Sequence, residues 1–215
     1  MTGLLITLEG IEGSGKSTQA SRLRNTLIQD RIPVSLTREP GGSPLAERVR
    51  ELILRGGEEP LAPGAEVLLF LAARAQHVAR TIRPALDRGE VVVCDRFTDA
   101  TIAYQGGGRT IPEAFLTSLN DWATGGLKPA RTYLLDVPVD VGLERAKKRT
   151  GASDRFETES KAFFEAVRAR YLDIARREPE RMMVLRGTDP EEILAHQIKT
   201  DVHRILSGRT PNVPR

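Results

Sequence analysis

The chain has 215 residues, of which 28% are charged and 40% hydrophobic, and its formal net charge is +3. This length is typical of one α/β domain with a full hydrophobic core. The single cysteine, Cys94, excludes an intramolecular disulfide framework, and the mild positive charge does not imply nucleic acid binding.

The N-terminus does not resemble a signal peptide, because it lacks a basic region and Glu9 interrupts its apolar run. The longest apolar stretch, residues 67–73, is too short to span a bilayer. We therefore expect a cytoplasmic protein without a membrane partner. Residues 1–206 are expected to form a single domain, and the Pro-rich polar residues 207–215 a disordered tail.

A glycine-rich motif at residues 10–17 follows the first predicted strand, at about 3–9, and precedes an amphipathic helix at 17–30. It fits G-x-x-x-x-G-K-[ST], the pattern of a phosphate-binding loop. The flanking strand and helix favour this interpretation over a chance glycine-rich turn. The glycines let backbone N–H groups face an anion, and the helix N-terminus adds its dipole. Lys16 is expected to reach the outer phosphates of a nucleoside triphosphate, and Ser17 to ligate Mg²⁺.

A second strand at 33–37 ends in the polar turn 38–42, which contains Arg38. Functional residues of an open α/β sheet gather at the carboxyl ends of its strands. We therefore expect this turn to face the phosphate-binding loop. A short helix is predicted at about 43–55.

A long helix is predicted over residues 66–87, with Phe70, Arg74 and His77 on one face. A guanidinium among apolar neighbours needs either a carboxylate or a ligand as its partner. Phe70 by itself has the character of a core residue. Its position beside Arg74 suggests instead a ring that stacks on a planar ligand and a donor group for the edge of that ligand.

A third strand, 90–95, ends in Asp95, followed directly by Arg96. Four apolar residues and an aspartate are typical of the second nucleotide-site motif, whose carboxylate lies near Mg²⁺. Asp136, at the end of a predicted strand within 128–136, is the rival for this role. We prefer Asp95 because Arg96 adds a phosphate ligand at the same strand end, whereas Asp136 could cap a helix.

Thr101, Tyr104 and Gln105 have the spacing of one helix face, on a short helix before the glycine run 106–108. The amide of Gln105 offers a donor and an acceptor in one plane, which suits the edge of a base. A solvated helix end is the alternative. A further helix is predicted at 111–123.

A basic segment at about 145–156 follows a helix predicted at 140–149, and its glycine and small residues indicate a mobile lid. A solvated helix C-terminus is the alternative. The remaining predicted elements are a helix at 156–177, a strand at 182–185 and a helix at 190–206. Five short strands that alternate with helices predict a doubly wound, three-layer α/β/α sandwich.

Together these motifs resemble the thymidylate kinase family along essentially the whole chain. The matching elements are Glu12 inside the loop, Thr37-Arg38-Glu39-Pro40-Gly41-Gly42, Phe70 with Arg74, Asp95-Arg96-Phe97, Tyr104-Gln105-Gly106-Gly107-Gly108-Arg109 and the Arg-rich lid. The resemblance implies a P-loop nucleoside monophosphate kinase fold with a five-stranded parallel sheet. It also implies a homodimer and the phosphorylation of dTMP to dTDP with ATP and Mg²⁺, in the synthesis of dTTP.

The resemblance also implies a role for each site residue. ATP is expected at Gly10, Ile11, Glu12, Gly13, Ser14, Gly15, Lys16, Ser17 and Thr18, with Ser17 and Asp95 at Mg²⁺. dTMP is expected at Glu12, Arg38, Phe70, Arg74, Arg96, Thr101, Tyr104 and Gln105. The phosphate-binding loop carries no arginine, so the catalytic arginine is expected in the lid, as Arg155 first and Arg149 second, besides Lys16 and Arg96.

Other kinases of nucleosides or nucleoside monophosphates are the nearest alternative. A GTPase switch would need N-K-x-D and D-x-x-G motifs, and the sequence contains neither. A motor or transport ATPase would need a partner surface or a catalytic glutamate next to Asp95, where this chain has Arg96.

Overall fold

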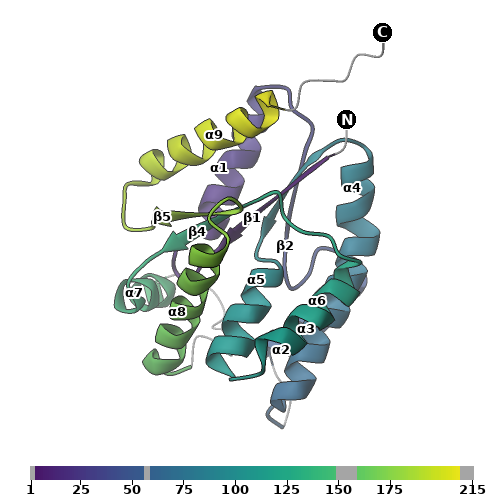
Figure 1. Cartoon of the computed structure of the whole chain (residues 1–215), viewed down its shortest axis with the longest axis vertical. Helices are drawn as coiled ribbons and strands as arrows, with labels where there is room; N and C mark the ends of the chain where they lie inside the picture. The colour runs from purple at the N-terminus through teal and green to yellow at the C-terminus, as the bar shows by residue number, and fades with distance from the viewer. Residues whose placement is uncertain (1–2, 56–58, 149–158, 209–215) are drawn as a thin grey trace.

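The computed structural model describes residues 3–55, 59–148 and 159–208. A five-stranded sheet forms its centre (Figure 1). The strands are β1 (Leu4–Glu9), β2 (Val34–Arg38), β3 (Val91–Asp95), β4 (Arg131–Asp136) and β5 (Met182–Arg186). They lie in the order β2-β3-β1-β4-β5, and every neighbouring pair is parallel. The predicted five-stranded parallel sheet is confirmed.

The chain order changes direction at β1, because β2 and β3 lie on one side of this strand and β4 and β5 on the other. Ligands of open α/β sheets bind at such a switch point, beyond the carboxyl ends of the strands. The loop after β1 and the residues after β3 meet at this place. The sheet therefore brings the first and third predicted strand ends together.

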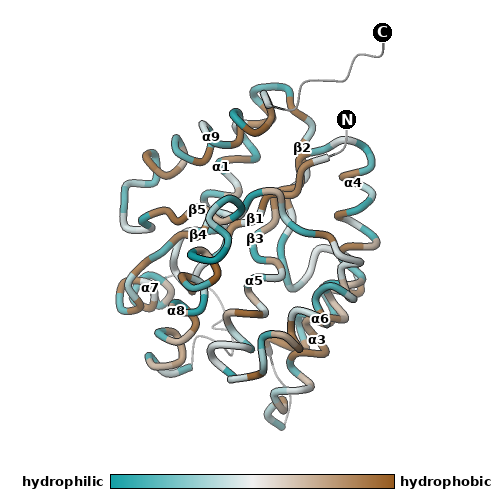
Figure 2. Tube along the Cα trace, viewed as in Figure 1, coloured by the Kyte–Doolittle hydropathy of each residue, from teal (hydrophilic) through white to brown (hydrophobic). Residues whose placement is uncertain are grey.

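Two helices, α1 (Lys16–Gln29) and α9 (Glu191–Ser207), pack on one face of the sheet. Alternate residues of a strand point to opposite faces, and the apolar cluster under these helices includes Leu4, Ile6 and Leu8 of β1, Leu23 of α1 and Ile198 of α9. In Figure 2 the central strands β1 and β3 are mainly hydrophobic, while the surrounding helices alternate between hydrophobic and hydrophilic residues. The apolar residues of the strands and helices are buried between the sheet and the helix layers, and this packing produces the predicted three-layer architecture.

The remaining helices pack on and around the opposite face. They are α2 (Pro44–Arg55), α3 (Pro63–His77), η1 (Val78–Ile82), α4 (Arg83–Asp87), α5 (Thr98–Thr101), η2 (Ile102–Gly108), α6 (Glu113–Thr124), α7 (Val139–Lys148) and α8 (Lys161–Arg177). The helices η1 and η2 are π-helical. Among the described residues, no helix combines the length and the apolar character that crossing a membrane requires.

The predicted helix 66–87 differs from the structure in two ways. It begins earlier, at Pro63, and the π-helical turn η1 interrupts it. Pro84 explains the wide turn, because a proline cannot donate a hydrogen bond to the carbonyl group four residues before it. The predicted helix 156–177 begins instead at Lys161, where the side chain of Ser160 accepts a hydrogen bond from the Phe163 N–H.

The glycine run 106–108 was predicted to follow a helix, but it lies inside η2. A Cβ atom on Gly107 would lie 2.9 Å from the carbonyl oxygen of Ala166, and one on Gly108 would overlap the ring of Phe163. The glycines therefore let η2 pack directly against α8. Of the predicted tail 207–215, Ser207 ends α9, and residues 209–215 lie outside the described part of the chain.

Candidate active site

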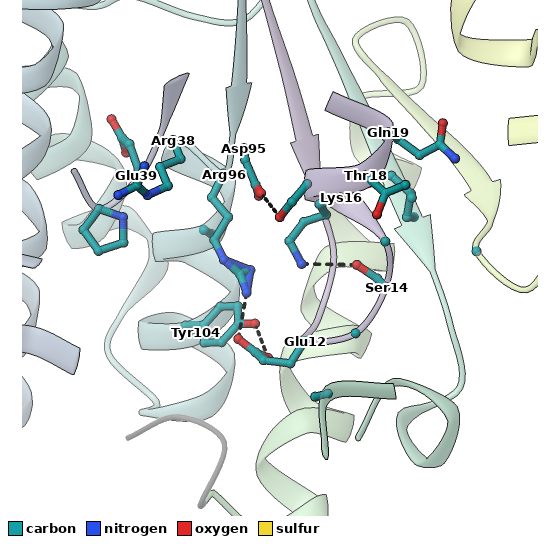
Figure 3. A pocket seen from close by; sticks show the side chains of 18 of the residues that line it. Glu12, Ser14, Lys16, Thr18, Gln19, Arg38, Glu39, Asp95, Arg96 and Tyr104 are labelled. Atoms are coloured by element: carbon teal, nitrogen blue, oxygen red, sulfur yellow. Dashed lines mark hydrogen bonds and ion pairs between the residues drawn. The ribbon is translucent and has the colours of Figure 1, made fainter. Parts of the chain in front are cut away.

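A cavity of about 770 Å³ opens at the carboxyl ends of the central strands (Figure 3). It is lined by the predicted residues Glu12, Gly13, Ser14, Gly15, Lys16, Ser17, Thr18, Arg38, Phe70, Arg74, Asp95, Arg96, Thr101, Tyr104 and Gln105. Two residues of the predicted loop do not line it. The side chain of Ile11 is buried in the core, and the carbonyl oxygen of Gly10 accepts a hydrogen bond from Arg96.

The loop between β1 and α1 has the conformation that its glycines allow. Gly15 has a φ of 94° and caps α1, and a Cβ atom on Gly13 would overlap the carbonyl group of Gly142 in α7. The ammonium group of Lys16 donates to the carbonyl oxygen of Ile11 at 2.7 Å. Burial, and then the charge of Arg96, lower the pKa of Lys16 to about 8. The free energy of this buried ammonium therefore falls when an anion enters the loop.

Two side chains with oxygen ligands for a metal, Ser17 and Asp95, meet beside the loop. The hydroxyl of Ser17 donates to Asp95 at 2.5 Å. The rival carboxylate, Asp136, instead accepts two hydrogen bonds from Arg168, at 2.6 and 2.9 Å. The preferred aspartate is therefore next to the phosphate-binding loop, while the rival is held in an ion pair with α8.

Arg96 stands between the loop and η2. Its φ is 70°, a conformation that is uncommon for a residue with a side chain. Its guanidinium donates to the Gly10 carbonyl at 3.0 Å and to Glu12 at 2.7 Å, and lies 5.1 Å from the centre of the Tyr104 ring. The hydroxyl of Tyr104 donates to the other oxygen of Glu12 at 2.7 Å. Burial acts to raise the pKa of Glu12, but the charges of Arg96 and Lys16 keep it below its usual value.

Two further lining residues of the cavity, Phe70 and Arg74, come from α3. Phe70 is partly buried and packs against the core as well as lining the cavity. Arg74 is buried, and it donates to Glu39 at 2.7 Å and to Thr101 at 2.7 Å. The sequence left open whether Arg74 meets a carboxylate or a ligand. It meets a carboxylate and also faces the cavity.

Gln105 also lines the cavity, and its amide nitrogen donates to Glu66 at 2.9 Å. Arg38 is exposed and pairs with Glu47 at 2.9 Å at the cavity rim. Arg145, at the start of the predicted lid, also lines the cavity. The two predicted catalytic arginines, Arg149 and Arg155, lie outside the described residues.

The sequence interpretation missed two buried glutamates. Glu66 was treated only as the start of a helix, although an acidic residue one turn before Phe70 lies on the same face. Glu9 was noted only as an interruption of an apolar run. It is fully buried and accepts hydrogen bonds from the Phe97 N–H at 2.7 Å and the Tyr171 hydroxyl at 2.8 Å. A carboxylate at the end of a mainly apolar, buried strand is the signal that could have identified it.

Comparison with known proteins agrees with this geometry. The sequence model of the thymidylate kinase family matches residues 8–198 of this chain. The chain belongs to this family. Thymidylate kinases of Pseudomonas fluorescens and Pseudomonas syringae pv. syringae are 56% and 57% identical to it; the first match covers 91% of both chains, and the second covers 84% of this chain and 86% of its relative.

A crystal structure of thymidylate kinase from Ehrlichia chaffeensis has a TM-score of 0.74 and 32% identity, covering 96% of this chain and 99% of that one. The expected family and its P-loop kinase fold are therefore confirmed. Membership makes the chain an enzyme, a nucleotide kinase of the family that phosphorylates dTMP in dTTP synthesis. Its substrates are small nucleotides, and its phosphoryl donor is a nucleotide.

Proposed function

We propose that this enzyme transfers the terminal phosphoryl group of ATP, bound with Mg²⁺, to the phosphate of dTMP, giving dTDP. The observation that carries the proposal is one cavity that joins the phosphate-binding loop to an aromatic and amide end. Lys16, Arg96 and Phe70 all line this cavity, and Figure 3 shows Lys16 and Arg96 from neighbouring strand ends beside each other. This arrangement suits two nucleotides held with their phosphates facing each other.

The loop residues 10–18 are assigned to the phosphates of ATP. Ser17 and Asp95 fit a Mg²⁺ ion, because a hydroxyl and a carboxylate lie together beside the loop and Mg²⁺ prefers a few oxygen ligands plus phosphate oxygens. When bound, Mg²⁺ neutralises charge on the transferred phosphoryl group. Lys16 adds a positive charge from the protein, since its buried ammonium is held by the loop itself.

The residues of the other end are assigned to dTMP. Phe70 stacks on the base, and Arg74 and Gln105 bind its edge, with Thr101 positioning Arg74. Tyr104 packs under the deoxyribose, where its contact with Glu12 directs that carboxylate toward the sugar 3′-hydroxyl. The acceptor phosphate is assigned to two arginines, Arg38 and Arg96.

Charge explains how these residues promote the reaction. Two anionic phosphates repel each other, so Lys16, Arg38 and Arg96 must offset their charge before they can meet. The acceptor phosphate oxygen is already a nucleophile, and no general base is needed. A lid arginine, Arg155 or else Arg149, completes the catalytic set and stabilises charge on the peripheral oxygens of a loose transition state.

The enzyme is proposed to be a homodimer that works in the cytoplasm, where ATP and dTMP are available. Support for the dimer comes from large apolar side chains exposed on neighbouring helices, including Leu52 of α2, Leu68 of α3 and Trp122 of α6. Light scattering should give a dimer mass for the wild type and a monomer mass for Leu68→Asp. Ile193→Asp, which changes an exposed apolar residue of α9, is the matched control and should remain dimeric.

The test of the activity is ADP formation from ATP with dTMP, dUMP, UMP, AMP or thymidine as acceptor. We expect dTMP to react fastest and dUMP more slowly, because one methyl group in an apolar pocket is worth about 1–3 kcal/mol. Preference for thymidine would identify a deoxynucleoside kinase instead, and preference for UMP or AMP another monophosphate kinase. Preference for UMP or AMP would remove the thymine assignment, whereas preference for thymidine would remove the assignment of the acceptor phosphate.

A further inference from the structure

The orientation of the Gln105 amide is fixed by the buried carboxylate of Glu66. Glu66 is only 1% exposed, and its oxygens also face the guanidinium of Arg109, with the closest ion-pair distance at 3.3 Å. An ionised carboxylate only accepts hydrogen bonds. The NH₂ group of Gln105 must therefore point toward Glu66, as the 2.9 Å bond shows. The opposite end of the amide is then its carbonyl oxygen.

The carbonyl oxygen of Gln105 is the polar atom that remains for a ligand. Gln105 lines the cavity, and no described residue donates a hydrogen bond to this oxygen. Gln105 is only 2% exposed, and the surface that it keeps lies in the wall of this cavity. At this position the cavity therefore offers a hydrogen-bond acceptor and not a donor.

Arg74 supplies the complementary donor. Its guanidinium has five N–H groups, and four hydrogen bonds, to Glu39, Thr101, Asn120 and the Phe97 carbonyl oxygen, use all of them except one on Nη2. These bonds hold the guanidinium in one orientation at the cavity wall. Together the two side chains present one donor and one acceptor.

We infer that Glu66 is a positioning residue that sets the choice of base, an inference that rests on the proposed function. A 4-oxo pyrimidine such as thymine or uracil carries an acceptor at O4 and a donor at N3–H, which complements Arg74 and the oriented Gln105. Cytosine carries the reverse pattern, a donor at N4 and an acceptor at N3. Glu66 keeps Gln105 from rotating to accept cytosine. Through this contact the enzyme rejects dCMP, while the 5-methyl group separates dTMP from dUMP.

The size of the effect follows from the cost of unpaired polar groups. A site built to hydrogen-bond a substrate discriminates by about 10⁴-fold or more against an analogue that cannot make the bond. Arg74 and Gln105 share this discrimination. Removal of the constraint on Gln105 alone is therefore expected to lower the preference for dTMP over dCMP by about tenfold or more, and not to abolish it.

The test is Glu66→Gln, assayed for kcat and KM with dTMP and dCMP. The new amide can donate to the carbonyl oxygen of Gln105, so the Gln105 amide can rotate and offer its NH₂ group to the base. Arg109 keeps an ion pair with Glu159, so the substitution does not leave its charge unpaired. We expect the KM for dTMP to rise, the kcat/KM for dCMP to rise, and the kcat for dTMP to stay within a few-fold.

The matched control is Glu113→Gln, which neutralises another arginine-paired glutamate, bound to Arg170 and outside the cavity. Its dTMP to dCMP ratio should equal that of the wild type. In a Gln105→Leu background, Glu66→Gln should have no further effect on the ratio. If Glu66→Gln does not fold, Glu66→Asp takes its place, because the shorter side chain withdraws from Gln105 and keeps its charge.

Failure of the proposed function and failure of this inference give different results. A wild type without activity on dTMP refutes the proposed function. A wild type that is active on dTMP, with a Glu66 variant whose dTMP to dCMP ratio is unchanged, overturns this inference alone. An equal loss of both activities also leaves the ratio unchanged and counts against the inference, because it would make Glu66 a merely structural residue.

Discussion

The guanidinium of Arg96 donates a 2.7 Å hydrogen bond to the carboxylate of Glu12, inside the phosphate-binding loop. A second bond to the Gly10 carbonyl and the ring of Tyr104 hold the same guanidinium at the middle of the cavity. Its orientation is thus set before any substrate enters. A residue prepared in this way can receive an anionic phosphate without a large change of conformation.

Arg96→Lys tests this preparation with the charge retained. A lysine has no planar donor fork and cannot contact Gly10, Glu12 and a phosphate together. We expect kcat/KM for dTMP to fall by about 10- to 100-fold, measured by steady-state kinetics. ATP affinity, measured by titration without dTMP, should stay within a few-fold. An equal loss of ATP affinity would assign Arg96 to the donor nucleotide.

Asp95→Asn tests the Mg²⁺ assignment. The asparagine keeps an oxygen that can accept from Ser17, so the local fold should persist, but the negative charge is lost. We expect the Mg²⁺ concentration for half-maximal rate to rise about tenfold or more. The matched control is Asp136→Asn at the other strand end, which should leave this concentration unchanged. The reverse result would give the metal role to Asp136.

Mg²⁺ binding is also expected to require the nucleotide. The described residues contain no group of three or more His, Cys, Asp or Glu side chains that could hold a metal ion. A melting curve of the protein with Mg²⁺ alone should therefore match the curve in EDTA, while ATP with Mg²⁺ should raise the melting temperature. A shift with the metal alone would reveal a site formed by protein residues.

Phe70→Ala tests the stacking role. The ring is only partly buried, and one side of it lines the cavity. Loss of base–aromatic stacking, about 1–3 kcal/mol, should raise the KM for dTMP about 5- to 100-fold and leave the KM for ATP nearly unchanged. Equal effects on both KM values would identify Phe70 as a core residue only.

Local motifs explain why most of the phosphate end could be predicted from sequence. The glycines and the lysine of the loop lie within one motif of eight residues, and the adjoining strand and helix have clear hydrophobic patterns. Asp95 and Asp136 were harder to separate, because both follow an apolar strand. Only the pairing of β3 with β1 brings Asp95 to Ser17.

The base end depends on contacts between distant elements. Glu66 and Gln105 are 39 positions apart, and they meet in a region where α6 packs against both α3 and η2. No spacing rule within one helix encodes that meeting. The wide turn of η2 has the same character, since the direct packing of Gly107 and Gly108 against α8 is a tertiary contact.

Arg155→Ala tests the lid type of mechanism inferred from the absence of an arginine in the loop. We expect kcat to fall by about 10³-fold or more, while the dissociation constant of dTMP stays within a few-fold. Single-turnover kinetics would separate the chemical step from product release. Arg149→Ala is the comparison variant and should have the smaller effect; the opposite order would transfer the role to Arg149.

Glu9→Gln tests the buried carboxyl beneath the site through the pH dependence of stability. Burial, and then the charge of Asp99, raise the pKa of Glu9 to about 8, although Tyr171 and Arg96 oppose the shift. Between pH 4.5 and 8 the folded protein thus keeps a proton that the unfolded chain has released. The free energy of unfolding must fall as pH rises through this window, by at most about 1.4 kcal/mol per pH unit, and then become constant.

In Glu9→Gln the side chain at position 9 cannot titrate, and its amide oxygen can still accept a hydrogen bond from the Phe97 N–H. Chemical denaturation from pH 5 to 8.5 should therefore show the wild type losing stability relative to Glu9→Gln. Glu144→Gln is the control, because the hydrogen bond from Lys148 lowers the pKa of this exposed carboxyl and it does not titrate in the window. Parallel curves for wild type and Glu9→Gln would mean that Arg96 keeps Glu9 ionised, and the carboxylate would then belong to the charge balance of the phosphate site.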